Sequence, residues 1–222
     1  MLTKTQLASI IDQTLLDPSA DRGRVEAFCR EAGELGFAAV ALLPCNVSLA
    51  RSILQGTNTK VCAALAFPLG TWPAELKAAE ARQAVKDGAE ELDVVMNVGA
   101  LKAGKLDQVR AELRGVVEAA EGRTVKVIIE LPLLTETEAA VACDLIAEAG
   151  AQFVKTSTGF KGFKLRGTTA DDVILLKRLA AGRIKVKAAG GIRTYELAAK
   201  MVECGVDRIG TSSGVAIVNQ CP

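Results

Sequence analysis

The chain has 222 residues, of which 50% are hydrophobic and 24% are charged, and its formal net charge is +1. Acids and bases are interspersed, with no basic block or aromatic ladder, so the composition excludes the electrostatic signature of a nucleic-acid-binding protein. No apolar run approaches the roughly 18 residues of a membrane span, and the amino terminus lacks the apolar stretch of a signal peptide. We therefore expect a cytoplasmic protein whose partners are neither nucleic acid nor membrane.

The sequence contains no histidine. This removes the commonest general base, the commonest metal ligand and any Ser-His or Cys-His nucleophile pair. The six cysteines show no C-x-x-C spacing, so we predict no metal site and free thiols in a reducing compartment. Cys221, close to the carboxyl terminus, is expected to be exposed.

Short apolar runs alternate with amphipathic segments along the whole chain. Several runs are rich in Val and Ile, as parallel strands buried on both faces tend to be, and we predict eight strands at residues 10–15, 38–43, 61–67, 91–97, 125–131, 152–157, 184–189 and 208–212. Helical patterns lie between them at 74–87, 110–120, 136–149, 171–179 and 195–204, with a short helix after the last strand. Eight alternations without a linker predict an α/β fold, a TIM (β/α)8 barrel forming a single domain over residues 1–222, with an open doubly wound sheet as the alternative.

The helical pattern at 74–87 is the clearest of these segments. Leu76, Ala79, Ala84 and Val85 can share an apolar stripe, which predicts that Lys77 and the other charged residues face water.

Polar residues interrupt two strands where charge is unusual. Asp12 and Thr14 can share one face of the first strand, although a capping role at the start of the chain is an alternative. Glu130 ends the strand at 125–131, and we favour a charge that meets solvent over a second inward carboxylate.

Lys155 is the most informative residue, because it lies in the strand-like run Gln-Phe-Val-Lys-Thr-Ser. Lysine is almost never fully buried unless it is paired, and one use of a buried lysine is as a neutral amine that forms a Schiff base with a carbonyl. Lys187 lies in a similar strand, and Asp93 lies on a third. If these three strand faces point into the barrel, two lysines and an aspartate converge.

A shifted pKa is the physical requirement for this chemistry. A lysine with a pKa of about 10.4 is neutral in only about one molecule in 2,500 at pH 7, and lowering the pKa to about 7 takes roughly 4.6 kcal/mol. Burial and the neighbouring ammonium of Lys187 can supply this, while Asp93 would balance the charge and relay a proton through water. A structural Lys-Asp ion pair inside the barrel is the alternative that the pattern leaves open.

Two glycine-rich turns follow the last two predicted strands and lead into helices. Exposed amides, glycines and hydroxyls at such turns favour a phosphate site, and the loops after strands seven and eight often hold phosphate in this fold. Arg193 would add a direct charge contact; two ordinary strand-helix turns are the alternative. The residues concerned are Gly190, Gly191, Arg193, Gly210, Ser212 and Ser213.

Together these segments resemble the deoxyribose-phosphate aldolase family, which consists of class I (Schiff-base) aldolases with a TIM-barrel fold. The matching stretches follow the family's order and span nearly the whole chain: residues 11–16, 67–70, 91–99, 126–130, 153–160, 186–193 and 208–214.

The resemblance implies a role for each of four residues. Lys155 would form the Schiff base, Lys187 would lower its pKa, Asp93 would assist proton transfer through water, and Asp12 would support the lysine network. The implied reaction is reversible cleavage of 2-deoxy-D-ribose 5-phosphate to acetaldehyde and D-glyceraldehyde 3-phosphate, without a metal or organic cofactor, in a possible homodimer. The expected substrate and phosphate contacts are Thr14, Thr158, Gly159, Gly190, Gly191, Arg193, Gly210, Ser212 and Ser213.

The chain departs from the family's usual pattern at several places. Gln13 stands where histidine is usual, Ala41 where cysteine is common, Leu131 and Pro132 follow Glu130, and the loop at 161–167 is longer and more basic. Three alternatives therefore stay open. They are an aldolase with altered aldehyde preference, another phosphate-binding barrel enzyme such as an isomerase or synthase with Lys155 as general base, and a non-catalytic sugar-phosphate binder.

Overall fold

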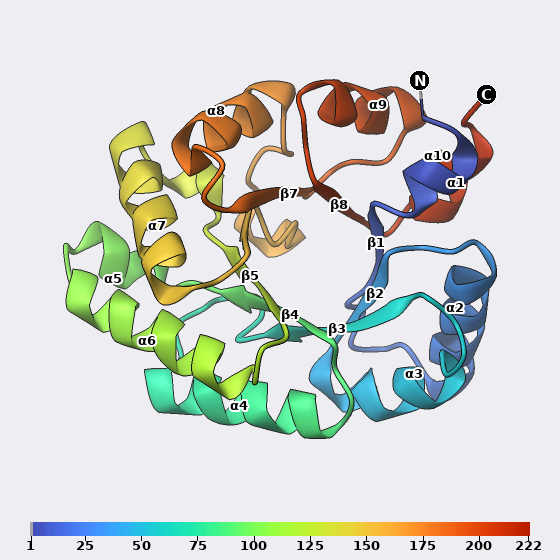
Figure 1. Ribbon diagram of the computed structural model, residues 1–222, viewed down its shortest axis with the longest axis horizontal. Coiled ribbons are helices and arrows are strands. Elements are labelled where there is room, and N and C mark those ends of the chain that lie inside the picture. The colour runs from blue at the N-terminus through green and yellow to red at the C-terminus, as the bar shows by residue number, and fades with distance from the viewer. Residues whose placement is uncertain (1) are drawn as a thin grey trace.

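The computed structural model describes residues 2–222 and shows a closed barrel of eight parallel strands in sequence order, surrounded by helices (Figure 1). The barrel closes where the first strand pairs with the last, with Asp12 opposite Gly210. The predicted TIM (β/α)8 fold is thus confirmed. The strands are β1 Ile11–Leu15, β2 Ala39–Leu42, β3 Lys60–Leu65, β4 Glu91–Val95, β5 Thr124–Ile128, β6 Phe153–Lys155, β7 Lys185–Ala189 and β8 Arg208–Thr211.

Several strands end earlier than the sequence predicted. β5 ends at Ile128 and β6 at Lys155, because the chain leaves the sheet there to form the loops around one end of the barrel. Lys155 therefore lies at the carboxyl end of its strand and not at its middle. In this fold the carboxyl ends of the strands carry the active site.

The five longer helices predicted from the sequence are all present, together with the short last one. The pattern did not reveal the helices Lys4–Ala8, Arg22–Glu34, Val47–Ile53 and Val98–Lys102. None of the helices in the described part of the chain is long and apolar enough to cross a membrane. The helices are α1 Lys4–Ala8, α2 Arg22–Glu34, α3 Val47–Ile53, α4 Ala74–Lys86, α5 Val98–Lys102, α6 Leu106–Ala119, α7 Glu136–Ala149, α8 Ala170–Ala180, α9 Tyr195–Glu203 and α10 Gly214–Asn219.

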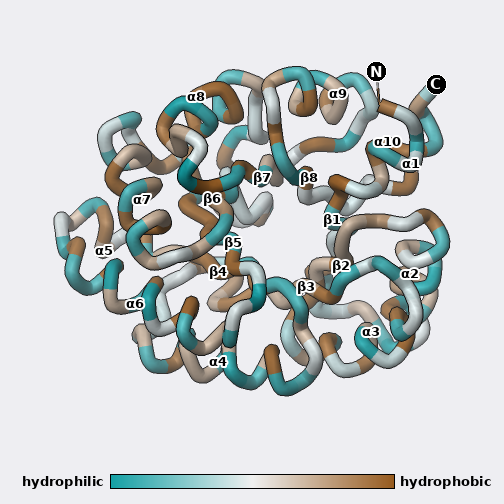
Figure 2. Tube along the Cα trace, viewed as in Figure 1, coloured by the Kyte–Doolittle hydropathy of each residue, from teal (hydrophilic) through white to brown (hydrophobic). Residues whose placement is uncertain are grey.

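The apolar core lies between the strands and the helices, and the barrel interior is largely polar. The main cluster of buried hydrophobic residues joins the outward faces of the strands to the helices, and the helices alternate hydrophobic and hydrophilic residues along their length (Figure 2). A small second cluster of Ala39, Ala41 and Cys62 lies inside the barrel. The interior is therefore free to hold charged side chains, provided that they are paired.

The predicted buried face of α4 is confirmed at Ala84 and Val85 and wrong at its start. Leu76 is 54% exposed, whereas Lys77 is fully buried. Its Nζ donates to Glu112 Oε1 of α6 at 2.7 Å and to the carbonyl of Val95 at 2.8 Å. A lysine with a buried carboxylate partner can occupy a packed helix face, and this rotates the buried stripe away from Leu76.

The cysteines are unpaired, as predicted, but one of them lies elsewhere than expected. All six are free thiols. Cys221 is buried, with its Sγ 3.5 Å from the carbonyl oxygen of Leu2. The two ends of the described chain meet beside α1 and α10 (Figure 1), so the position of this residue near the terminus did not make it exposed.

Candidate active site

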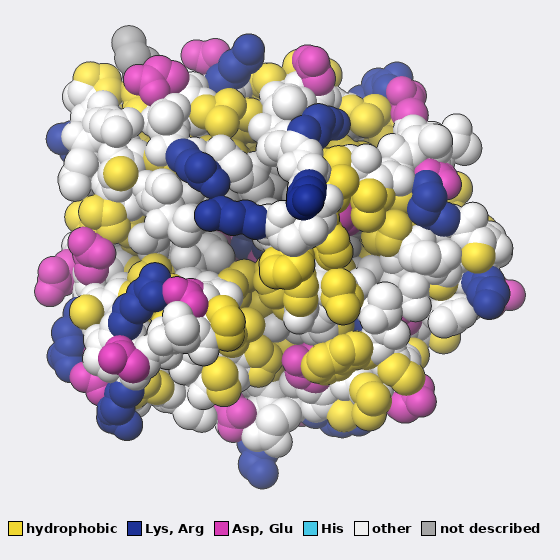
Figure 3. Space-filling model, turned by 180° about the vertical axis from the view of Figure 1, so that it is seen from behind, with side chains coloured by type: hydrophobic (Ala, Val, Ile, Leu, Met, Phe, Trp, Pro, Cys, Tyr) yellow, Lys and Arg dark blue, Asp and Glu magenta, His cyan; other side chains and the backbone are white. Residues whose placement is uncertain are grey.

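A cavity of about 450 Å³ opens at the carboxyl ends of the strands. Figure 3 shows a hollow near the centre of the face behind that of Figure 1, with Lys and Arg side chains along one side and hydrophobic side chains along the other. The cavity brings together residues predicted from four separate strands and their loops. Those that line it are Thr14, Lys155, Thr158, Gly159, Gly190, Gly191, Arg193, Gly210 and Ser212.

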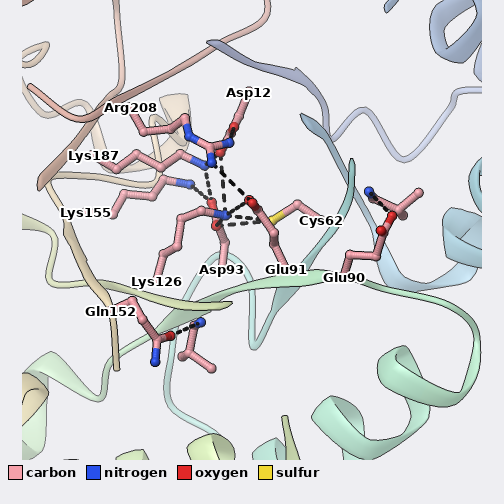
Figure 4. A network of polar contacts seen from close by, with 12 residues as sticks. Asp12, Cys62, Glu90, Glu91, Asp93, Lys126, Gln152, Lys155, Lys187 and Arg208 are labelled. Atoms are coloured by element: carbon pink, nitrogen blue, oxygen red, sulfur yellow. Dashed lines mark hydrogen bonds and ion pairs between the residues drawn. The ribbon is translucent and has the colours of Figure 1, made fainter. Parts of the chain in front are cut away.

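The three residues predicted to converge do so inside the barrel (Figure 4). The Nζ atoms of Lys155 and Lys187 each lie 2.7 Å from Oδ2 of Asp93, and Lys187 also pairs with Asp12. The register explains this, because Lys155 and Lys187 are directly opposed partners on neighbouring strands. Lys155 is 5% exposed and the other three side chains are fully buried.

The network is larger than the sequence indicated. Lys126 Nζ lies 3.0 Å from Asp93 Oδ1 and also pairs with Glu91. The guanidinium of Arg208 donates to Asp12 and Glu91, and Cys62 Sγ lies 3.2 Å from Asp93 Oδ1. Of the network's side chains in residues 2–222, only Lys155 also lines the cavity. A lysine inside an apolar strand was the signal that identified Lys155, and the same signal would have found Lys126.

The pKa of Lys155 differs in direction from those of its basic neighbours. Burial lowers the pKa of Lys155, and the nearby charge of Lys187 lowers it further, against the opposing effect of Asp93. Burial also disfavours the charged forms of Lys126 and Lys187, but their carboxylate partners raise the pKa of each above its ordinary value. Lys155 is thus the lysine of this network whose neutral form is favoured.

The two aspartates remain ionised at neutral pH. Burial alone would raise the pKa of Asp93, but Lys126, Lys155 and Lys187 hold it well below its usual value. Burial likewise opposes ionisation of Asp12, yet Lys187, Lys126 and Arg208 lower its pKa. Asp93 therefore accepts hydrogen bonds from the lysines as a carboxylate.

Close backbone approach explains the glycines around the cavity. Gly159 has φ +71°, and a Cβ there would lie 3.1 Å from Cα of Gly190. A Cβ on Gly210 would lie 3.0 Å from Cε of Lys187, so a side chain there would displace the lysine. Gly190 and Gly191 also adopt positive φ angles, where a side chain is strained.

The predicted serines and threonines occupy different positions. Ser212 lines the cavity, whereas Ser213 lies outside the cavity lining and precedes α10. Thr14 lines the cavity, and its hydroxyl donates to the carbonyl of Asp12 at 3.0 Å. The capping alternative for Asp12 does not describe its contacts, which lie inside the barrel.

The interpretation of Glu130 as a solvent-facing charge is wrong. Glu130 is 3% exposed and adopts φ +47° at the end of β5. Its Oε2 accepts hydrogen bonds from the N–H and the hydroxyl of Thr158 at 3.2 and 2.6 Å. The carboxylate turns inward because it satisfies two donors at the start of the loop after β6. These two hydrogen bonds hold Thr158, which lines the cavity, in place.

Of these departures from the family pattern, the loop at 161–167 is the one that borders the cavity. Gln13 points to α10, where its Oε1 accepts from the N–H of Gly214 at 2.9 Å. Ala41 lies in the small interior cluster. Phe160 and Lys161 do line the cavity, and Arg166 anchors the loop to α8 through two hydrogen bonds to Asp172 at 2.6 and 2.8 Å.

Three comparisons agree with this geometry. The family model described as DeoC/LacD family aldolase matches residues 7–219. The chain is 48% identical to the deoxyribose-phosphate aldolase of Dictyoglomus turgidum, covering 98% of each chain, and 48% identical to that of Thermococcus kodakarensis, covering 100% of this chain and 99% of the relative. Among solved structures it is similar to QR15, an aldolase, with 45% identity, TM-score 0.91 and coverage of 96% and 95%. It is also similar to the deoxyribose phosphate aldolase of Aeropyrum pernix, with 37% identity, TM-score 0.90 and coverage of 98% and 91%; that structure is described as a unique tetramer.

Proposed function

The chain belongs to the DeoC/LacD family of aldolases, and we propose that it cleaves 2-deoxy-D-ribose 5-phosphate reversibly to acetaldehyde and D-glyceraldehyde 3-phosphate. The observation that carries the proposal is the position of Lys155, a buried amine with a lowered pKa at the floor of the cavity. The names of the curated relatives supply the substrate. We take residues 1–222 as one aldolase domain, supported by the family match over 7–219.

The proposed reaction begins at the open-chain aldehyde. The neutral amine of Lys155 attacks C1, and loss of water gives an iminium ion. A base removes the proton from the C3 hydroxyl, the C2–C3 bond breaks, and its electron pair flows into the iminium. D-glyceraldehyde 3-phosphate leaves, and the enamine that remains is protonated at C2. Hydrolysis of the resulting iminium releases acetaldehyde and restores the amine.

The charges under Lys155 suit these proton transfers. Asp93 is an ionised carboxylate 2.7 Å from the amine, so it can hold and orient Nζ and accept protons through a water in the cavity. Lys187 is an ammonium 2.7 Å from the same oxygen. It disfavours a positive charge on free Lys155 and can return a proton through water during the steps that follow. Asp12 keeps Lys187 in place.

We assign the phosphate to the glycine-rich side of the cavity. Gly190, Gly191 and Gly210 bring backbone close to the ligand, Ser212 offers a hydroxyl, and Arg193 offers a cation. Among the described residues, the backbone N–H groups of Gly190 and Gly191 have no protein acceptor. Such amides are suited to bind phosphate oxygens. Phe160 and Lys161 also line the cavity and would contact the substrate.

The compartment and the assembly belong to the same proposal. We propose a cytoplasmic location, as expected for an enzyme that acts on a sugar phosphate. A homodimer remains a prediction, and the tetramer described for the Aeropyrum pernix relative makes the number of subunits a point to measure by light scattering.

Borohydride trapping tests the proposed function. Sodium borohydride added with acetaldehyde should reduce the iminium to a stable ethyl adduct, which peptide mass spectrometry should place on Lys155. Lys155→Met should give no adduct there while remaining folded. An isomerase or synthase with Lys155 as general base would turn over without an adduct, and a non-catalytic binder would show neither adduct nor turnover. The absence of an adduct on the folded enzyme with excess aldehyde would rule out the Schiff-base aldolase mechanism.

A further inference from the structure

Two side chains at the bottom of the barrel take no part in the proposed chemistry. Glu91 is the first residue of β4 and Arg208 is the first of β8, so both lie at the end opposite to the cavity. Arg208 Nη1 lies 2.6 Å from Asp12 Oδ1, and its Nη2 lies 3.2 Å from Glu91 Oε1 (Figure 4). In residues 2–222, the one ion pair of Lys155 is with Asp93. Glu91 and Arg208 therefore touch neither Lys155 nor the substrate cavity.

Every strand except β2 contributes an ionisable group to this interior, and β2 contributes Ala39 and Ala41. The Cys62 thiol stays neutral, because burial raises its pKa far above the usual range. The carboxylates are Asp12, Glu91 and Asp93, and the basic groups are Lys126, Lys155, Lys187 and Arg208. On the cavity side, the charged residues of the two adjoining pockets are Asp17, Glu130, Lys161, Arg166 and Arg193.

Three carboxylates face four basic groups, so the interior is electrically neutral only when one basic group has lost its proton. A net charge in a dry interior is costly. Arg208 cannot lose a proton in a protein. Lys126 pairs with Asp12, Glu91 and Asp93, and Lys187 pairs with two of these, whereas Lys155 pairs with one. The group held by the fewest carboxylates is therefore the one that gives up its proton.

We propose that Glu91 and Arg208 are positioning residues that set the protonation state of Lys155 in opposite directions, through the charge balance of the barrel interior. The negative charge of Glu91 favours the ammonium form of Lys155, and the positive charge of Arg208 favours the free amine. The proposal rests on the proposed function of Lys155 as the nucleophile. It assigns to the bottom of the barrel a part in catalysis that requires no contact with substrate.

The test is an NMR titration of isotope-labelled lysine in three variants. Glu91→Gln should lower the pKa of Lys155 by about one pH unit and Arg208→Gln should raise it by about one unit, the size that unit charges about 10 Å apart produce at an effective dielectric constant of about 20. In the double variant the two shifts should largely cancel. The acid limb of the pH profile of kcat/KM should move in the same directions, which a merely structural role would not cause.

Glu90 and Arg51 provide a matched control. They form a carboxylate–guanidinium pair 3.2 Å apart on the surface, and Glu90 lies apart from the network in Figure 4. Glu90→Gln and Arg51→Gln should leave the titration of Lys155 unchanged. If Glu91→Gln does not fold, the upward shift in Arg208→Gln carries the test.

Shifts of Lys155 in the same direction in both single variants would overturn the inference, and so would an unshifted pKa in Arg208→Gln. The titration reads proton binding directly and does not depend on turnover. A trapped adduct without these shifts would overturn this inference and leave the aldolase mechanism standing. Opposite shifts without any adduct would support the charge balance and overturn the Schiff-base function.

Discussion

Replacing Lys187 by methionine removes the cation nearest to Lys155 while keeping most of the side-chain volume. Both lysine nitrogens lie 2.7 Å from the same oxygen of Asp93, so they are no farther apart than twice that distance, about 5.4 Å. Asp12 keeps Arg208 as a partner and Asp93 keeps Lys126, so neither carboxylate is left without a cation. The main effect is therefore expected on Lys155 itself.

The magnitude follows from Coulomb's law. Two unit charges about 5.4 Å apart at an effective dielectric constant of about 20 repel by about 3 kcal/mol, which corresponds to about two pKa units. Losing this repulsion should raise the pKa of Lys155 by about two units. On the acid limb, kcat/KM is proportional to the fraction of free amine, so it should fall about 100-fold at a fixed pH and recover as the pH rises.

The assay is the pH profile of kcat/KM for 2-deoxy-D-ribose 5-phosphate cleavage, from about pH 5 to about pH 10. Lys200→Met, an exposed lysine on α9, is the control and should leave the profile unchanged. An acid limb that stays in place in Lys187→Met, with activity reduced equally at every pH, would refute the assigned role of Lys187 and reduce it to a structural contact.

Three further results are expected. Because the folded-state pKa of Lys155 lies below its unfolded value, the unfolded chain binds more protons between the two values. The free energy of unfolding of the wild type, relative to that of Lys155→Met, should therefore rise with pH, by at most about 1.4 kcal/mol per pH unit. If urea denaturation gives the same difference in unfolding free energy between the two proteins from pH 7 to pH 9, this prediction is contradicted. Gly159 has φ +71°, and a Cβ there would contact the backbone of Gly190. Gly159→Ala should therefore raise KM for the phosphorylated sugar roughly tenfold, about 1.4 kcal/mol of binding, while activity on unphosphorylated 2-deoxyribose changes little. Equal losses on both substrates would contradict an effect on the phosphate site. Lys77→Met should cost about 3–5 kcal/mol of stability, because it leaves Glu112 buried without a cation. The double variant Lys77→Met, Glu112→Gln should recover much of that stability. A double variant no more stable than Lys77→Met would contradict a stabilising Lys77–Glu112 ion pair.

The sequence predicted the fold and the centre of the site because both depend on strict periodicity. Side chains alternate along a strand, so Asp93, Lys155 and Lys187 had to point to one side of their strands, and barrel closure placed those sides together. The length of each strand was less predictable. Residues 129–131 are as apolar as the strand before them, and only the turn at Glu130 shows where the sheet ends.

That Arg208 pairs with Asp12 inside the barrel could not be predicted from the sequence, for a physical reason. Arg208 and Asp12 are separated by 196 positions in the chain, and no local pattern reports a partner at that distance. Arg208 begins its strand, where an arginine is usually solvated. The same limitation explains Lys77, which was read as a surface lysine because its partner lies on another helix. Burial of charge is decided by long-range pairing, which periodicity does not encode.

The sealing of the charges beneath Lys155 has a consequence for how the enzyme responds to ionic strength. Dissolved ions cannot enter a region whose side chains are fully buried, and screening acts on charges that solvent reaches. Arg193 and Lys161, at the mouth, are exposed. Added salt should thus weaken binding of the phosphate and leave the reactivity of the Lys155 amine unchanged. Ionic strength should therefore affect substrate binding separately from cleavage of the carbon–carbon bond.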